Sequence, residues 1–265
     1  MFNSLLPNAM TQNQRLIFLT EYLLAESDKY RDIDIPNNIT EQKKLLRSLM
    51  NVRAPKAVSD KFIKVQNEYL KCETAEKGIT DADTLPFAEN KIILWQGDIT
   101  TLKCGAIVNA ANSAMLGCFV PCYKCIDNAI HTFAGIELRH ECAEIMNKQG
   151  FAEQTGRAKI TKAYNLPCDF VLHTVGPIVD GYLTQRHCAM LASCYNSCID
   201  LAEQRAIKSI AFPCISTGEF CFPNKKAAEI AINTVRKRLK TSTVERVIFN
   251  VFNDGDKQIY KKLLG

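Results

Sequence analysis

Residues 91–112 read KIILWQGDITTLKCGAIVNAAN, and they decide the fold because they contain two apolar strand patterns, each followed by a polar loop. Short, wholly apolar runs such as KIILW and AIVNAA are typical of strands covered on both faces. Three similar runs follow, at 169–175, 209–214 and 246–252, with helical patterns at about 127–149, 187–205, 224–240 and 256–264. This alternation predicts an α/β domain over residues 87–265, with a mostly parallel sheet between two layers of helices.

The preceding residues, 1–86, have a different pattern. Leucines recur at helical spacing in 11–26 and again in 40–52, and a third helix is expected at about 59–72. Thr11 and Thr40 are candidate N-caps for the first two helices. Because such short helices are unstable alone, this N-terminal extension is expected to pack on the α/β domain as a cap.

Composition restricts the class of protein. The chain has 265 residues, is 47% apolar and carries a net charge of +5, with no stretch of about 18 apolar residues. Its first residues lack the pattern of a signal peptide, so we expect a soluble, cytoplasmic protein whose twelve cysteines are mostly reduced thiols. The basic residues are dispersed, apart from a run at 236–240 that fits a solvated helix face, so neither a nucleic-acid nor a membrane partner is expected.

In parallel sheets, ligands bind beyond the carboxyl ends of the strands, so the loops that follow the predicted strands are candidate binding sites. The loop STGEF, residues 216–220, joins a strand to a helix, and Gly218 would let backbone N–H groups point at an anion. An ordinary strand-to-helix turn is the alternative. Asp98 in GDIT could read an exocyclic amine or simply cap a helix.

Taken in order, GDIT, AIVNAAN, IDNAIHTFAG, HTVGP and FPCISTGEFCFP resemble a macrodomain, the ADP-ribose-binding fold. The resemblance runs from residue 91 to the C-terminus and implies a three-layer α/β/α sandwich with a mixed, mostly parallel sheet. It also implies that Asp98 and Phe252 bind adenine, that residues 216–220 hold the diphosphate, and that Asn112 and Phe220 meet the distal ribose. A core position is the alternative for Phe252. The implied substrate-binding set is Asp98, Ile99, Asn112, Ser216, Thr217, Gly218, Glu219, Phe220 and Phe252.

The stretch GCFVPCYKC, residues 117–125, narrows the resemblance to the zinc-containing macrodomains. Residues 45–55 (LLRSLMNVRAP) and 66–70 (Q-x-x-Y-L) also resemble the N-terminal extension of that group. Tyr123 stands where that group has a zinc-binding histidine. Since a phenol is a poor zinc ligand and a thiolate a good one, the expected ligands are Cys118, Cys122 and Cys125, with an open position for water or substrate. A redox pair of Cys122 and Cys125, or three incidental thiols, is the alternative.

The resemblance implies a zinc-dependent protein ADP-ribosylhydrolase that removes mono-ADP-ribose from acidic side chains. Asp127 and Asn112 are the candidate catalytic residues: Asp127 as a general base or water-orienting group, Asn112 as the residue that holds the ribose. The substrate's own phosphate could instead activate the water, with Asp127 only positioning it. Asp127 could also simply cap a helix, and His131 could be a partner of Asp127 or a satisfied buried histidine.

Other functions stay open at this point. A reader module would bind ADP-ribose without cleaving it, a deacetylase would act on O-acetyl-ADP-ribose, and a redox or zinc scaffold would bind neither. Relatives of this kind also imply a sirtuin-like ADP-ribosyltransferase and a lipoyl-carrier protein as partners.

Overall fold

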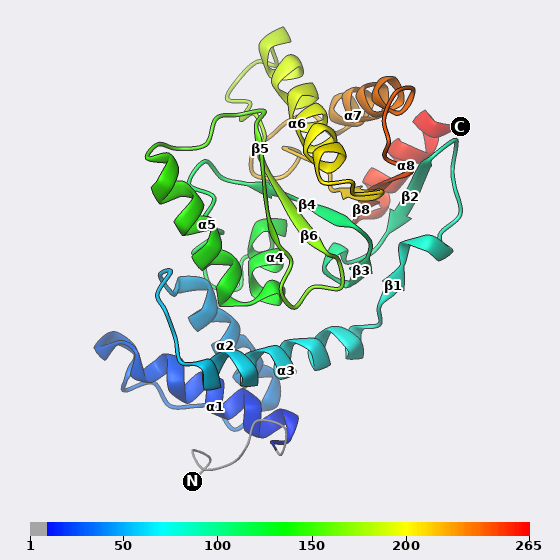
Figure 1. Cartoon of the computed structure of the whole chain (residues 1–265). Coiled ribbons are helices and arrows are strands. Elements are labelled where there is room, and N and C mark those ends of the chain that lie inside the picture. Colours follow the sequence, from blue (N-terminus) through cyan, green and yellow to red (C-terminus); the bar gives the residue numbers. More distant parts are fainter. Residues whose placement is uncertain (1–9) are drawn as a thin grey trace.

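A computed structural model describes residues 10–265, and so omits the first nine residues of the expected 1–86 extension. Three helices come first, followed by an α/β domain (Figure 1). The helices are α1 (Gln12–Ala25), α2 (Ile39–Val52), α3 (Asp60–Lys77), α4 (Ile126–Ala134), α5 (Ile136–Gln149), α6 (Gln185–Gln204), α7 (Asn224–Leu239) and α8 (Asp254–Leu264), with 3-10 turns η3 (Asp28–Tyr30), η4 (Ala82–Thr84) and η5 (Ile99–Thr101). The strands are β1 (Thr80–Asp81), β2 (Ile92–Gln96), β3 (Leu102–Lys103), β4 (Ala106–Ala111), β5 (Ala158–Lys162), β6 (Phe170–Val175), β7 (Ser209–Phe212) and β8 (Arg246–Val251).

The main sheet has six strands in the order β2-β8-β7-β4-β6-β5. All neighbours are parallel except β5, which runs antiparallel to β6 at one edge. Strands β1 and β3 form a separate parallel pair. The mixed, mostly parallel sheet is therefore confirmed. The sequence analysis did not predict β5, because its residues AKITK mix lysine with apolar positions on a partly exposed edge.

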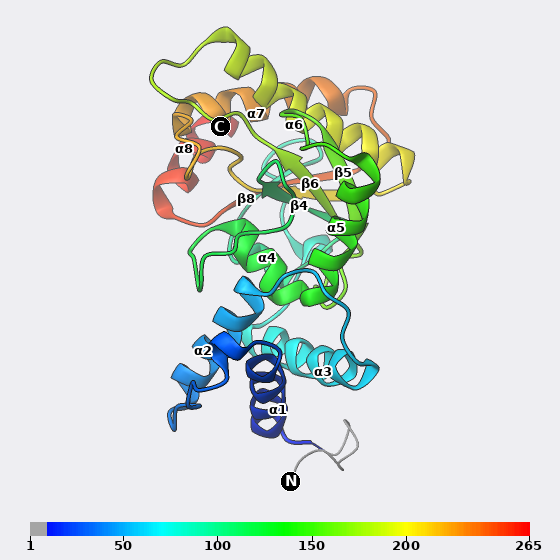
Figure 2. The same ribbon diagram turned by 90° about the vertical axis from the view of Figure 1, so that its left-hand side faces the viewer.

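Helices cover both faces of this sheet, so the three-layer α/β/α sandwich is also confirmed (Figures 1 and 2). On one face, α6, α7 and α8 enclose the larger core around Tyr195, Phe212 and Phe249. On the other face, α4 and α5 enclose a second core around Ile130 and Leu138. Within residues 10–265, no helix is both long enough and apolar enough to cross a membrane.

The N-terminal helices lie beyond α4 and α5 and have a core of their own, built from residues such as Leu16, Leu46 and Phe62 (Figure 2). Thr11 caps α1 with a full capping box, as predicted. The prediction for Thr40 was wrong: Asn38 caps α2, because its side-chain oxygen accepts hydrogen bonds from the N–H groups of Thr40 and Glu41.

The single helix predicted at 127–149 is two helices that meet at Gly135. Gly135 has φ +99°, and a Cβ there would lie 2.6 Å from the Gln66 side chain of α3. That buried glutamine accepts a hydrogen bond from the Ile136 N–H at 3.0 Å and donates to Glu137 at 2.9 Å. The interruption therefore fastens α3 to the junction of α4 and α5.

Candidate active site

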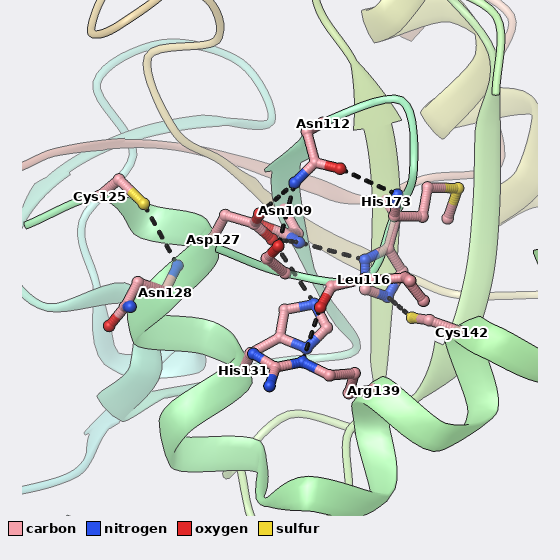
Figure 3. A network of polar contacts seen from close by, with 12 residues as sticks. Asn109, Asn112, Leu116, Cys125, Asp127, Asn128, His131, Arg139, Cys142 and His173 are labelled. Atoms are coloured by element: carbon pink, nitrogen blue, oxygen red, sulfur yellow. Dashed lines mark hydrogen bonds and ion pairs between the residues drawn. The ribbon is translucent and has the colours of Figure 1, made fainter. Parts of the chain in front are cut away.

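The candidate site lies where β4 ends and α4 begins (Figure 3). Asn109 is on β4, Asn112 follows it, and Asp127 lies in the first turn of α4. Because parallel strands end at the same edge of the sheet, the loops after β7 and β8 are expected along that edge too. The sequence-predicted catalytic pair, Asp127 and Asn112, is brought together by this arrangement.

Asp127 is a buried carboxylate held by two amides. Its Oδ1 accepts a hydrogen bond from Asn109 Nδ2 at 2.8 Å, and its Oδ2 accepts one from Asn112 Nδ2 at 3.2 Å. Burial raises the pKa of Asp127 to about 6, while the Asn109 bond, the charge of Arg139 and the Asn112 bond all act to lower it. The carboxyl is thus ionised at neutral pH but poised close to protonation, which suits a general base.

Asn109 is a site residue that the sequence analysis did not include. Its amide nitrogen donates to Asp127 and to His173 Nδ1, the latter at 3.2 Å. His173 Nδ1 is then the acceptor, so the proton lies on Nε2, 2.9 Å from Thr161 Oγ1. The hydrophobic pattern alone predicts Asn109 as a residue of a buried strand. The one sequence signal for a role in the site is that Asn109 is polar within the apolar run AIVNAA.

Two histidines and a cysteine lie behind Asp127. One ligand atom from each of His131, Cys142 and His173 lies within 4.8 Å of the others, so this buried group could hold a metal ion. Burial lowers the pKa of both histidines, that of His173 to about 3, and raises the pKa of Cys142 to about 12. All three are neutral at pH 7 in this structure, and both His173 nitrogens already have partners.

His131 is buried, as expected, but it is not the satisfied histidine that was the alternative for it. Neither ring nitrogen makes a hydrogen bond within the described residues 10–265, although Nε2 lies 3.5 Å from Asp127 Oδ1. Because the ring is neutral, this contact is not an ion pair. Gly117, with φ +78°, packs directly on the ring: a Cβ there would approach its Cγ to 2.8 Å.

Asn112 organises the loop that leads toward the cysteines. Its Oδ1 accepts hydrogen bonds from the N–H groups of Ala114 and Met115, and its Nδ2 donates to the Gly117 carbonyl at 3.1 Å as well as to Asp127. The Asn112 side chain therefore couples the start of the 117–125 loop to the carboxylate. A contact with the distal ribose stays a prediction.

The three cysteines of residues 117–125, the cysteine loop, are not gathered at one point. Cys118 and Cys125 are neighbours: burial raises the pKa of the Cys125 thiol to about 11, and the nearby Cys118 adds to the shift. Cys122 has φ +52° and faces α2, with its sulfur 3.3 Å from Ser48 Oγ and 3.5 Å from the Lys44 carbonyl oxygen. Two of the predicted ligands are thus adjacent, and the third lies against the N-terminal helices.

Tyr123, the neighbour of Cys122 in sequence, lies near Glu219 of the 216–220 loop. A hydrogen bond to Glu219 raises the pKa of its phenol, with smaller contributions from burial, the charge of Glu219 and the two thiols Cys125 and Cys118. Tyr123, which replaces the expected histidine, is therefore close enough to the 216–220 loop and to the thiols of Cys118 and Cys125 to feel their charges.

The loop 216–220 has the features of an anion-binding turn. Within residues 10–265, the backbone N–H groups of Gly218, Glu219 and Phe220 donate to no acceptor, and a Cβ at Gly218 would meet no atom within 4 Å. Ser216 has φ +67°, and its buried hydroxyl has no hydrogen-bond partner in the part of the chain that the structure describes. Free donors on an open turn are what a diphosphate requires.

Gly176 in HTVGP makes room for that turn. A Cβ there would lie 2.0 Å from Ser216 Oγ, so only glycine is compatible with the position of this hydroxyl. Thr217 closes the turn on the other side by donating its hydroxyl proton to the Cys214 carbonyl at 2.9 Å. The Phe220 carbonyl accepts from the Val179 N–H at 2.9 Å, which ties the turn to the loop after β6.

The two residues that the resemblance assigns to adenine binding, Phe252 and Asp98, lie in different surroundings. Phe252 is 78% exposed, so the alternative of a core position is wrong and its ring is free to meet a ligand. Asp98 caps η5, accepting hydrogen bonds from the N–H and hydroxyl of Thr100, and also pairs with Lys77 at 2.9 Å. Burial acts to raise the pKa of Asp98, but those bonds outweigh it and lower the pKa. The side chain of Ile99 is buried in the core. Adenine contacts stay predictions.

Comparison with known proteins gives a consistent result. The sequence pattern of the family described as "Macro domain" matches residues 108–231. A protein-ADP-ribose hydrolase of Treponema medium is 54% identical over 260 residues, which cover 96% of this chain and all of that protein. A protein-ADP-ribose hydrolase of Staphylococcus aureus (strain MSSA476) is 46% identical over 249 residues, covering 91% and 93%.

This chain belongs to the macrodomain protein-ADP-ribose hydrolase family. Among solved structures, the Trypanosoma brucei macrodomain in complex with ADP-ribose matches with a TM-score of 0.62 and 28% identity, covering 97% of this chain and 92% of that one. An Oceanobacillus iheyensis macrodomain mutant with ADPR is 35% identical over 68% of this chain and 96% of that one, also with a TM-score of 0.62. Because the T. medium match covers 96% of this chain, it includes the N-terminal helices as well as the macrodomain.

Proposed function

We propose that this protein hydrolyses the bond between ADP-ribose and a modified protein side chain. The observation that carries the proposal is the buried Asp127, held by the amides of Asn109 and Asn112 in a chain 54% identical to a protein-ADP-ribose hydrolase. The free N–H groups of the 216–220 loop supply a diphosphate site in the same domain. A carboxylate ester of aspartate or glutamate is the linkage that the sequence resemblance favours.

In the proposed reaction, the 216–220 loop binds the diphosphate and Asn112 orients the distal ribose. A water molecule then attacks the anomeric carbon, the new carbon–oxygen bond forms there, and the ester oxygen leaves on the side-chain carboxylate. Asp127 accepts the proton of the water, and the products are ADP-ribose and an unmodified acidic residue. A pKa of about 6 leaves Asp127 mainly ionised at pH 7 and able to take that proton.

The proposal includes a zinc ion bound by the cysteine loop. The pair Cys118 and Cys125 fits a thiolate-bound metal, because the two thiols are neighbours and zinc prefers thiolate ligands. The full set does not fit as the loop stands, because the Cys122 sulfur lies against Ser48. Cys122 would become the third ligand only if its side chain turned from α2. A bound zinc ion supplies Lewis acidity and orientation of sugar hydroxyls.

Elemental analysis of the purified protein and its variants tests the zinc site. Loss of zinc in Cys118→Ala, Cys122→Ser and Cys125→Ala supports the three-cysteine site. Loss of zinc in Cys142→Ala instead, with all three loop variants still loaded, would assign the metal to His131, Cys142 and His173. A wild-type protein that contains no zinc would contradict this part of the proposal.

Release of ADP-ribose from a protein ADP-ribosylated on acidic residues tests the activity itself. Turnover by the wild type is expected, and binding of ADP-ribose without release would make the protein a reader module. The proposal extends to its partners: the substrate would be made by a sirtuin-like ADP-ribosyltransferase acting on a lipoyl-carrier protein. Comparison of that substrate with other ADP-ribosylated proteins checks this preference.

A further inference from the structure

The cysteine loop is held in place from outside the macrodomain, by one face of α2. Lys44, Arg47, Ser48 and Asn51 follow helical spacing and lie along that face. Each contacts the cysteine loop or the first turns of α4, which follows it. The macrodomain match, residues 108–231, does not include α2.

Arg47 makes the largest number of these polar contacts. Its Nη2 donates to Asn128 Oδ1 at 2.7 Å and its Nε to the same oxygen at 3.3 Å, and Nη2 also lies 3.4 Å from the Tyr123 carbonyl oxygen. Asn128 in turn donates through Nδ2 to the Val120 carbonyl at 3.0 Å, and its backbone N–H points at Cys125 Sγ at 3.4 Å. Arg47 therefore fixes an amide that touches the middle and the end of the cysteine loop.

Asn51 supplies a second, buried contact. Its Oδ1 accepts the Cys122 N–H at 2.9 Å, and its Nδ2 donates to Thr132 Oγ1 at 3.0 Å. Asn51 is 1% exposed, so breaking either bond would leave a buried polar group without a partner. The contact also holds Cys122 in its left-handed conformation, which is costly for a residue other than glycine.

We propose that α2 positions the cysteine loop for hydrolysis, with Arg47 and Asn51 as its positioning residues. The inference rests on the proposed function. Asp127 lies between Cys125 and Asn128 in sequence, so the same contacts that hold the loop also fix the first turn of α4, which carries the carboxylate. A loop that loses them would leave the distal ribose and Asp127 poorly aligned, without removing the diphosphate site at 216–220.

The test compares Arg47→Ala with Lys43→Ala, a matched cation on α2 that pairs with Glu73 of α3 and does not touch the loop. For Arg47→Ala we expect kcat to fall by on the order of tenfold or more, because small misplacements of reacting groups are costly in rate. The dissociation constant for ADP-ribose, measured by calorimetry, is expected to change by less than about threefold, since phosphate contacts are intact. Lys43→Ala is expected to match the wild type in both.

A second readout is independent of turnover. The rates at which Cys118, Cys122 and Cys125 react with an alkylating reagent are followed by peptide mass spectrometry. We expect faster alkylation of Cys122 in Arg47→Ala and in Asn51→Ser, while the exposed Cys221 reacts at an unchanged rate in every variant. Asn51→Ser shortens the side chain that reaches the Cys122 N–H, and it serves as the second variant if Arg47→Ala does not fold.

Wild-type kcat and wild-type alkylation rates in folded Arg47→Ala and Asn51→Ser would overturn the inference. A fall in kcat that Lys43→Ala reproduces would also overturn it, because the effect would then reflect general loss of stability. If the wild type releases no ADP-ribose, the proposed function fails, whereas faster alkylation in the two variants would still show that α2 holds the loop.

Discussion

A buried carboxylate without a cation bonded to it is the most informative single residue in this protein. Asp127 receives amide hydrogen bonds rather than a salt bridge, so burial dominates and its pKa rises to about 6. Arg139 acts only through its field, because its own hydrogen bonds go to main-chain carbonyls. Amide hydrogen bonds fix the position of a carboxylate and lower its pKa only in part. An ion pair with a bonded cation would lower that pKa much further and so weaken the carboxylate as a base.

Gly117 gives the first prediction at this scale. Gly117→Ala is expected to cost about 1–3 kcal/mol of unfolding free energy, because φ is +78° and the new Cβ would meet the His131 ring at 2.8 Å. Urea denaturation measures the loss. Gly181→Ala is the matched control, since Gly181 has φ +82° but open space around it. Equal losses in the two variants would contradict the packing of Gly117 on His131.

The buried histidines predict how stability depends on pH. His173 has a folded pKa of about 3, so the unfolded chain binds a proton that the folded protein does not, and stability falls as pH drops below about 6.5. At pH 5 this loss amounts to about 2 kcal/mol, and His131 acts in the same direction. Asp127, whose folded pKa is raised, gains a proton on folding and offsets about 1 kcal/mol of it.

The net expectation is therefore a lower free energy of unfolding at pH 5 than at pH 7.5, measured by urea denaturation at both. Equal stability at the two pH values would show that His173 and His131 are not buried as neutral rings.

At the scale of elements, a single arginine joins α5 to the end of α2. Arg139 Nη1 donates to the carbonyls of Met50, Asn51 and Arg53 at 3.0, 2.8 and 2.6 Å, and its Nε donates to the Leu116 carbonyl at 2.7 Å. These are the carbonyls that the C-terminus of a helix leaves without partners. Arg139 thus caps α2 and holds the start of the cysteine loop with the same guanidinium.

Arg139→Ala is expected to destabilise the protein by about 3 kcal/mol or more, because several buried carbonyls would lose their donors. Arg238→Ala is the comparison, since Arg238 also pairs with two partners, Asp200 and Glu203, but on a more exposed surface. Its loss is expected to cost about 1 kcal/mol or less. Thermal and urea unfolding measure both, and similar losses would contradict the capping role.

The elements that the sequence predicted correctly are those whose periodicity comes from burial. The apolar runs at 91–95 and 106–111 correspond to β2 and β4, because a short continuous apolar run is typical of a strand covered on both faces. The break at Gly135 and the cap at Asn38 were not predicted. The break depends on a contact with Gln66 of α3, which is distant in sequence. The cap depends on which of two nearby polar residues, Asn38 or Thr40, directs its side chain to the first turn of α2.

The residues of the candidate site also divide into those that the sequence identified and those that only the structure revealed. The resemblance to macrodomains pointed to Asp127 and Asn112, and the structure brings their side chains to within 3.2 Å of each other. The direction of the Cys122 side chain could not be predicted, since it is set by Ser48 and Asn51, more than seventy residues away. Arg47 and Arg139 were missed for that reason: their partners are main-chain and amide groups that no spacing rule identifies.

At the scale of the whole molecule, the N-terminal helices and the macrodomain share polar contacts that neither could replace alone. Arg47, Asn51 and Gln66 reach from α2 and α3 into α4 and α5, and Arg139 reaches back. Opening this boundary would expose Asn51 and Gln66, both buried, together with Ile136, which packs on the N-terminal core. The two parts are therefore expected to unfold together.

Cooperative unfolding is tested with two probes. Trp95, the one tryptophan of the chain, lies on β2 and reports on the macrodomain, while far-ultraviolet circular dichroism also includes α1–α3. The two transitions are expected to coincide in urea. A first dichroism transition that leaves Trp95 fluorescence unchanged would show that the N-terminal helices unfold separately.

The most direct test of the central claim is the turnover of Asp127→Asn on a protein ADP-ribosylated at acidic residues. The amide keeps the shape of the carboxylate and cannot accept the proton, so kcat is expected to fall by about a hundredfold or more. ADP-ribose affinity measured in the same experiment should stay close to that of the wild type. Full turnover by Asp127→Asn would contradict the role assigned to this carboxylate.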